Sequence, residues 1–161
     1  MKLATMLRSA VSAAALTVLA PGHAAEMRAF DSGSLQAIKS AKAGRPFVVV
    51  FWSIYCAPCI EDMADWRELR ARHPTIPVIL VLADAPADRA RASRLLEEYP
   101  PGDVELWAFA DDFGERTRYA VDRTWRGELP RTYFFDPSGR IDVVTGRLDR
   151  RWADNWFNRQ R

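Results

Sequence analysis

One stretch of the chain constrains its fold more than any other, an apolar run that leads into two closely spaced cysteines. Residues Phe47–Trp52 are continuously apolar, β-branched or aromatic, which is typical of a strand buried on both faces of a parallel sheet. Cys56 and Cys59 follow within a few residues, and they are the only cysteines among 161 residues. Apolar residues at helical spacing predict a helix from about Cys59 to Arg72. The sequence therefore predicts a strand, a short turn and a helix that starts at a C-x-x-C motif.

Strand-like and helix-like segments alternate through the rest of the chain. The expected strands are Phe47–Trp52, Val78–Leu82, Val104–Phe109, Thr132–Phe135 and Ile141–Thr145. The expected helices are Ser34–Ala43, Cys59–Arg72, Ala87–Tyr99, Gly114–Val121 and Leu148–Phe157. The turn residues Asp136–Gly139 favour a hairpin between the last two strands. This order predicts an α/β fold in which helices flank a central mixed sheet.

The first residues have the pattern of a targeting segment. Lys2 and Arg8 form a basic leader, an apolar run follows from Ala10 to Ala20, and small residues stand near Ala24 and Ala25. Such a pattern predicts a secretory signal peptide over residues 1–25 and a single domain over residues 26–161. We therefore expect export to the periplasm, with an uncleaved N-terminal membrane anchor as the alternative.

The charge balance disfavours nucleic acid as a partner. The chain has 23 Lys and Arg against 21 Asp and Glu, and removal of Lys2 and Arg8 with the leader leaves 21 of each sign. A chain without excess positive charge has little to neutralise a phosphate backbone. We expect no nucleic-acid binding, and membrane contact only if the leader is retained.

The spacing of the two cysteines favours redox chemistry over a structural bridge. A disulfide between Cys56 and Cys59 closes a very small loop, so it gains little by restricting the unfolded chain. A thiol at a helix N-terminus is stabilised as its thiolate, which makes Cys56 the expected nucleophile. Cys59, one turn further along, would attack a mixed disulfide at Cys56 and release the substrate. Pro58 suits the first helical turn because it has no N–H to leave unpaired.

Other residues are expected to line this site and to bind substrate. Trp52 and Tyr55 would flank it as aromatic walls, with Pro58 beside the nucleophile. Leu129 and Pro130 precede a further strand, where a cis proline would make a sharp turn and leave the backbone of Leu129 free for an extended peptide.

These motifs together resemble the thioredoxin superfamily, and more closely its exported TlpA/ResA-type thiol–disulfide oxidoreductases. The similarity rests on Trp52–Cys59, Leu129–Pro130 and Phe135–Ile141, and it covers Phe30–Phe157. It implies a thioredoxin-like fold with an inserted helix and strand, Cys56 as nucleophile, Cys59 as resolving thiol and Pro130 in cis. It also implies a monomer without a cofactor that takes electrons from a membrane thiol–disulfide donor. Its substrates would be oxidised exported proteins such as apocytochrome c.

The chain departs from the thioredoxin pattern at several positions. Val50 stands where thioredoxin has a buried Asp, so the proton acceptor for Cys59 has to be another group, with Glu61 and Asp62 as candidates by proximity. Ala64 stands where relatives often have a helix proline, and Leu129 stands where Thr, Val or Ile is frequent before the cis proline. The dipeptide between the cysteines contains no histidine, which favours a reductant over a strong oxidant.

Three alternatives belong to other classes of function. Two cysteines cannot fill a tetrahedral zinc site, and the two histidines are His23 in the leader and His73 at a helix end, where a solvated or capping role is expected. A two-thiolate Cu(I) site would make the chain a metallochaperone. Peroxidase activity is disfavoured by the dithiol spacing. A non-catalytic binding module could use Trp152 and Trp156, although aromatic residues at helical spacing usually belong to the core.

Overall fold

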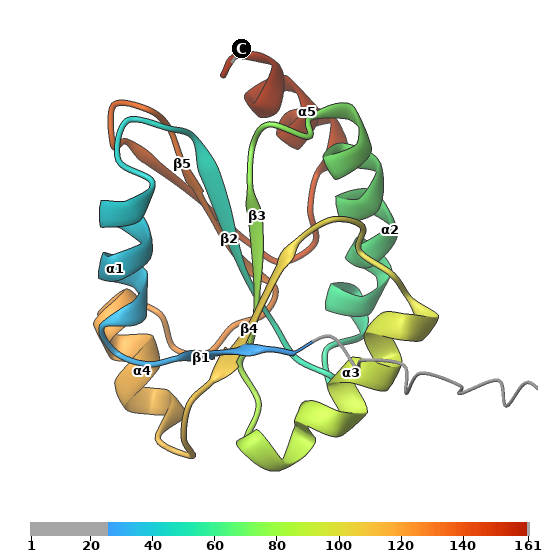
Figure 1. The fold of residues 1–161 in the computed structure, drawn as a ribbon, viewed down its shortest axis with the longest axis vertical. Coiled ribbons are helices and arrows are strands. Elements are labelled where there is room, and N and C mark those ends of the chain that lie inside the picture. The colour runs from blue at the N-terminus through green and yellow to red at the C-terminus, as the bar shows by residue number, and fades with distance from the viewer. Residues whose placement is uncertain (1–25, 161) are drawn as a thin grey trace, which may run out of the picture.

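A six-stranded mixed sheet organises the molecule, with helices on both faces (Figure 1). The computed structural model describes residues 26–160, so the predicted signal peptide lies outside the described residues. The strands are β1 (Arg28–Phe30), β2 (Phe47–Trp52), β3 (Val78–Leu82), β4 (Glu105–Phe109), β5 (Arg131–Phe135) and β6 (Ile141–Thr145). The helices are α1 (Ser34–Ala41), α2 (Ala57–Arg72), α3 (Arg89–Glu98), α4 (Gly114–Val121) and α5 (Arg150–Asn158), with a 3₁₀ turn η1 (Pro86–Asp88) before α3.

The strand order is β1-β4-β3-β2-β5-β6, which confirms the predicted mixed sheet. β2 is parallel to β3, β3 to β4 and β4 to β1, whereas β5 is antiparallel to both β2 and β6. All residues of β2 and β3 are buried, as expected for strands covered on both faces. The carboxyl ends of these two neighbouring parallel strands therefore lie side by side. Open α/β sheets usually bind ligands just beyond the carboxyl ends of their strands.

Alternating side chains of β2 divide the core into two layers. Val48, Val50 and Trp52 pack on one face, with apolar residues of α2, α3 and α5. Phe47, Val49 and Phe51 point to the other face, where α1 and α4 lie (Figure 1). Helix α2 thus packs against a core that is rich in aromatic side chains.

Several predicted boundaries and environments differ from those observed. Strand β1 was not predicted, because three residues are too few to show a period and the strand is defined by its parallel pairing with β4. Helix α2 begins at Ala57 because Cys56 serves as its N-cap. Trp156 is fully buried and Trp152 packs edge-on against Phe134, with ring centroids 5.0 Å apart. These tryptophans therefore belong to the core, as the more common pattern predicted.

A tight turn joins β5 and β6. Gly139 has a φ of 87°, and the backbone N–H of Asp136 donates to the carbonyl of Arg140 at 3.0 Å, so the predicted turn between β5 and β6 is confirmed. Within residues 26–160, every helix is too short or too polar to cross a membrane.

Candidate active site

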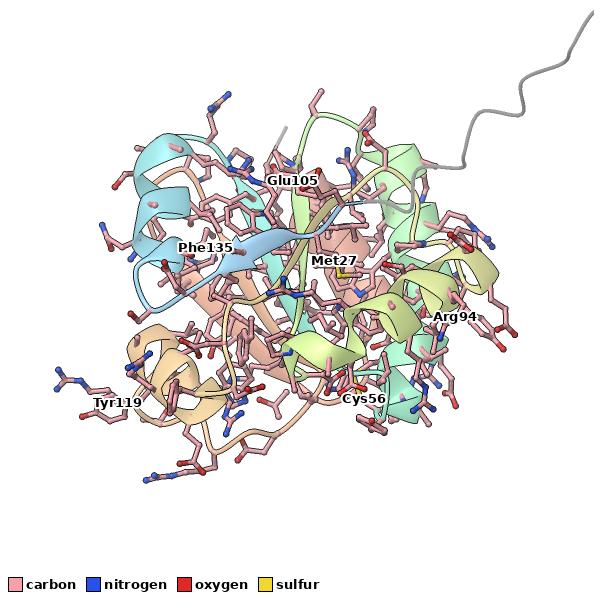
Figure 2. The ribbon with its side chains drawn as sticks, turned by 60° about the horizontal axis from the view of Figure 1, so that its bottom comes forward. Met27, Cys56, Arg94, Glu105, Tyr119 and Phe135 are labelled. Atoms are coloured by element: carbon pink, nitrogen blue, oxygen red, sulfur yellow. A yellow bond between two sulfur atoms is a disulfide. The ribbon has the colours of Figure 1, made fainter. Side chains whose placement is uncertain are left out.

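Cys56 and Cys59 form a disulfide at the point where β2 gives way to α2. Their sulfurs are 2.07 Å apart and their Cα atoms 5.2 Å apart. Figure 2 shows Cys56 at the surface near the beginning of α2. The predicted strand, turn and helix are thus confirmed, and the C-x-x-C pair lies just beyond the carboxyl end of β2.

The two cysteines differ in their access to solvent. Cys59 is only 2 % exposed, whereas Cys56 is half-buried. The Sγ of Cys56 accepts a hydrogen bond from the backbone N–H of Cys59 at 3.2 Å. That N–H and the helix N-terminus are positioned to stabilise negative charge on Cys56 when the disulfide is reduced. Cys56 is therefore the more accessible sulfur of the pair, and Cys59 is shielded from solvent.

Asp84, which was not among the predicted site residues, binds the segment before Cys56 through hydrogen bonds. Asp84, just after β3, accepts a hydrogen bond from the Ser53 hydroxyl at 2.6 Å and another from the Ile54 N–H at 2.8 Å. The Ser53 hydroxyl oxygen in turn accepts from the Tyr55 N–H at 3.0 Å. The position of Asp84 at the carboxyl end of the neighbouring parallel strand is the signal that could have identified it.

The two predicted aromatic walls have different positions. Tyr55 is 68 % exposed, and its hydroxyl donates to Asp88 at 3.1 Å. Trp52 is fully buried among core residues that include Cys59, so it cannot form a wall that substrate touches. The prediction that Trp52 lines the site is therefore wrong. The alternation of side chains along β2 points Trp52 into the core, where it packs in the same cluster as Cys59. Pro58 lies exposed in the first turn of α2, beside Cys56.

The Leu129–Pro130 peptide bond is cis, as the sequence predicted. Arg131 pairs with Phe51 across β5 and β2, so one further step of the register brings Pro130 beside Trp52. Leu129 is half-buried and packs against the same cluster as Cys56. The structure therefore brings the proline loop to the cysteine-bearing end of β2.

A polar cluster ties the two ends of this loop together. Asp122, at the end of α4, accepts from Arg131 at 2.6 Å and from the Tyr133 hydroxyl at 3.2 Å. Burial acts to raise the pKa of Asp122, but hydrogen bonds from Thr124, Arg131 and Tyr133 outweigh it and lower that pKa to about 2. Burial raises the pKa of Tyr133 to about 12. The cluster thus holds a charged carboxylate at the base of the loop that ends in Pro130.

We expect Asp122→Asn to destabilise the protein at neutral pH by about 2 kcal/mol, because the pKa of Asp122 is lower in the folded than in the unfolded chain. This contribution is present above the unfolded pKa near 3.8 and is lost as the pH falls toward about 2. Urea unfolding at pH values from neutral down to this range measures it. Asp111→Asn, which removes an exposed partner of Arg116, should have little effect. A difference between the Asp122 variant and the native chain that did not shrink with falling pH would contradict this account.

The two carboxylates considered as proton acceptors for Cys59 lie in different environments. Glu61 is exposed and pairs with Arg147 at 2.8 Å. Asp62 is 1 % exposed and accepts from the Leu148 N–H at 2.9 Å and from Arg147 at 3.2 Å. Burial raises the pKa of Asp62, although these hydrogen bonds act to lower it. Asp62, three residues after Cys59 on α2, is therefore the buried one of the two candidates.

The site offers no ligand set for a metal beyond its two sulfurs. Within residues 26–160, no cluster of three or more His, Cys, Asp or Glu residues could hold an ion. His73 is the C-cap of α2, about 25 Å from Cys56 along the helix. It is 3 % exposed and contacts Asp154 at 2.9 Å, so the predicted capping role is confirmed and the predicted solvated environment is wrong.

A hollow of about 610 Å³ lies along the exposed side of α2. Ala57, Ile60 and Ala64 line it from α2, and Tyr99 and Pro100 line it from the end of α3. Its lining begins at Ala57, the residue after Cys56, so the hollow lies beside the start of α2.

Comparison with known proteins gives a consistent result. No family model matches the chain. The thiol–disulfide oxidoreductase ResA of Oceanobacillus iheyensis is 26 % identical over 117 residues, which are 71 % of this chain and 57 % of that protein. The chain thus matches little more than half the length of this curated relative.

Solved structures share the fold at low sequence identity. MTB DsbF, solved in mixed oxidised and reduced forms, has a TM-score of 0.60 and 23 % identity over 76 % of this chain and 85 % of that one. A secreted Mycobacterium tuberculosis disulfide oxidoreductase, homologous to E. coli DsbE, also has a TM-score of 0.60, with 14 % identity over 74 % of this chain and 85 % of that one. With its six-stranded sheet, its C-x-x-C disulfide at the start of α2 and its cis Pro130, the chain has a thioredoxin-like fold and is similar to ResA-type thiol–disulfide oxidoreductases.

Proposed function

We propose that this protein is an exported thiol–disulfide oxidoreductase that reduces disulfides in other exported proteins, with oxidised apocytochrome c as one substrate. The disulfide between a half-buried Cys56 and a buried Cys59 at the start of α2 is the observation that carries the proposal. The leader pattern in residues 1–25 supports export, as does the secreted relative from Mycobacterium tuberculosis. The ResA relative supports the redox activity.

The reaction starts from the dithiol form. The Cys56 thiolate attacks one sulfur of the substrate disulfide, so that a mixed disulfide forms and the other substrate sulfur leaves as a thiolate. Cys59 then loses its proton and attacks the Cys56 sulfur, which releases the second substrate thiolate. Two electrons pass from the dithiol to the substrate, whose two thiolates take up protons. The chain is left as the Cys56–Cys59 disulfide, and a membrane thiol–disulfide donor returns two electrons to it.

The residues around the cysteines support this direction of transfer. The dipeptide Ala57-Pro58 supplies no imidazolium beside the Cys56 thiolate. Asp84 accepts from the Ile54 N–H, and Asp88 in η1 accepts from the Tyr55 hydroxyl, so two carboxylates lie close to the segment before Cys56 and oppose extra negative charge there. A less stabilised thiolate makes the disulfide less oxidising, which favours reduction of substrates.

The backbone of Leu129 supports the choice of a polypeptide substrate. In the described part of the chain, the Leu129 backbone N–H and carbonyl make no hydrogen bond with other backbone groups outside the sheet ladders. A substrate strand could pair with these groups next to Cys56, while its side chains contact Tyr55 and Pro58.

Stoichiometric reduction of a disulfide tests the proposed activity. The chain is reduced with dithiothreitol, freed of reductant and mixed with an oxidised peptide that contains one intramolecular disulfide. We expect one peptide disulfide to be reduced for each Cys56–Cys59 disulfide that forms. A chain that kept both thiols free while the peptide stayed oxidised would overturn the proposal, and stoichiometric Cu(I) binding by such a chain would favour the metallochaperone.

Asp62→Asn is expected to slow the second step at neutral pH by about tenfold or more, because Asp62 is the proposed acceptor of the Cys59 proton. The rate should recover as the pH rises and Cys59 ionises unaided. Rapid-quench measurement of mixed-disulfide decay over a range of pH tests this expectation. Glu61→Gln is the matched control, since it removes the neighbouring exposed carboxylate that also contacts Arg147. Equal effects of both substitutions would show that only the general charge of the region matters.

A further inference from the structure

Arginines gather in one hollow on α4 and on the loop that leads to the cis proline. The hollow has a volume of about 450 Å³, and its charged lining consists of Arg116, Arg118, Arg123, Arg126 and a single acid, Glu115. This imbalance stands out because positive and negative residues are equal in number over residues 26–161. We call this feature the arginine hollow.

Few carboxylates neutralise these side chains. Arg116 pairs with Asp111 at 3.1 Å. Among the described residues, no carboxylate lies within 4.0 Å of the guanidinium groups of Arg118, Arg123 or Arg126. Three permanently charged guanidinium groups thus line one concave surface without forming an ion pair among the described residues.

The remaining acids of this region are engaged or lie elsewhere. Asp122 binds Arg131 and Tyr133, and Glu128 accepts the backbone N–H of Arg126 at 3.0 Å. Asp111 and Asp112 line an adjacent, smaller hollow of about 180 Å³, which shares Glu115 and Arg118 with the arginine hollow. The acidic residues therefore lie on the Arg118 side of the arginine hollow, whereas Arg123 and Arg126 line only the arginine hollow, where a negatively charged ligand would be favoured.

Two aromatic residues, Trp125 and Tyr119, also line the arginine hollow. Trp125 is 4 % exposed, and its indole N–H donates to the carbonyl of Glu128 at 2.9 Å. The backbone of Gly114 lies close to Arg118, since a Cβ at Gly114 would lie 3.2 Å from Nη1. Tyr119 is 58 % exposed, with the Arg123 guanidinium 5.6 Å from its ring centroid. Figure 2 shows Tyr119 projecting outward from α4.

The position of the arginine hollow connects it to the redox site. Arg126 is only three residues before Leu129, whose backbone is proposed to pair with substrate. In Figures 1 and 2, α4 lies toward the same end of the molecule as the start of α2. A polypeptide paired with Leu129 can therefore extend along the loop to Arg126 and Arg123.

We propose that the arginine hollow binds an acidic segment of the polypeptide substrate whose disulfide reacts at Cys56. This inference rests on the proposed function and adds a substrate class to it, exported proteins with Asp or Glu residues flanking the reactive disulfide. Guanidinium groups bind carboxylates through paired hydrogen bonds, and Tyr119 supplies apolar contact beside them. A concave hollow on a loop fits a peptide strand, whereas a membrane surface would need a flat or protruding face.

Two model substrates with the same disulfide core test the proposal, one with a glutamate tail and one with a glutamine tail. Both are offered to the reduced full chain at low and at high salt. We expect kcat/KM to be about three- to tenfold higher for the glutamate peptide at low salt, with the preference lost at high salt. The double variant Arg123→Gln/Arg126→Gln should lose the preference while it reduces the glutamine peptide as the native chain does.

A matched control removes the same charge elsewhere. Arg94 and Arg151 are exposed on α3 and α5, so Arg94→Gln/Arg151→Gln should keep the preference for the glutamate peptide. Equal kcat/KM for both peptides in the native chain would overturn the inference and leave the proposed function intact. An equal loss of preference in both double variants would also overturn it.

Direct binding separates this inference from the proposed activity. A cysteine-free, fluorescent glutamate peptide should raise its anisotropy with the native chain and lose this response with Arg123→Gln/Arg126→Gln. Such binding would support the proposed role of the arginine hollow even if neither disulfide peptide were reduced. Failure to reduce both peptides would contradict only the proposed function. Binding to anionic vesicles, with no response to the peptide, would overturn the inference in favour of a membrane surface.

Discussion

Cys56→Ser should abolish reduction of disulfide substrates, with a fall in rate of more than about 10³-fold. The hydroxyl of serine stays protonated near neutral pH, so it cannot replace the thiolate that attacks the substrate sulfur. The helix N-terminus, the N–H of Cys59 and the half-buried position of Cys56 would all remain, but without a reactive sulfur. Stopped-flow measurement of peptide disulfide reduction provides the rate.

The appropriate reference for Cys56→Ser is the reduced native chain, which also lacks the disulfide. The substitution changes one atom at a half-buried position, so urea unfolding should give nearly the same stability as for the reduced native chain. A variant that stayed folded and kept native-like activity would refute the assignment of Cys56 as nucleophile. Activity retained in Cys56→Ser but lost in Cys59→Ser would exchange the two roles.

Cys59→Ser should produce the second large effect, a mixed disulfide that accumulates instead of being resolved. Cys56 would still attack, but no neighbouring thiol would release the substrate. Because Cys59 is only 2 % exposed, a substrate sulfur reaches Cys56 and not this position in the native chain. We expect up to one substrate molecule bound per chain, seen by non-reducing electrophoresis and mass spectrometry and released by dithiothreitol.

The adduct also provides a route to the natural partner. When Cys59→Ser is expressed with its leader, the trapped proteins should be exported and should carry cysteines. Cys56→Ser is the control, since its remaining thiol is buried and should trap nothing. Absence of an adduct with any disulfide substrate, or equal trapping by both variants, would contradict dithiol exchange.

The sequence was sufficient to predict the elements that form the site. The continuous apolar run of β2, the C-x-x-C spacing and the Leu129-Pro130 pair each carry a local physical signal, respectively burial, thiol proximity and turn geometry. The sheet, the disulfide and the cis peptide bond confirm these predictions.

Features set by contacts between distant segments could not be predicted in this way. Asp84 holds Ser53 and Ile54 across 30 or 31 residues, and nothing in its local sequence distinguishes it from a surface carboxylate. Whether Trp52 faced substrate or core depended on the face of β2 to which it points. Glu61 and Asp62 are adjacent in sequence, yet the packing of Leu148 against α2 buries only the second.

The reduction potential of the Cys56–Cys59 couple tests the account most directly. Equilibration with glutathione or dithiothreitol buffers, followed by alkylation of the free thiols, gives the fraction reduced at each potential. The account predicts a value near about −270 mV, as for thioredoxin, so that the dithiol form donates electrons to exported proteins. A value near about −120 mV would contradict it, since the chain would then oxidise newly exported proteins instead of reducing them.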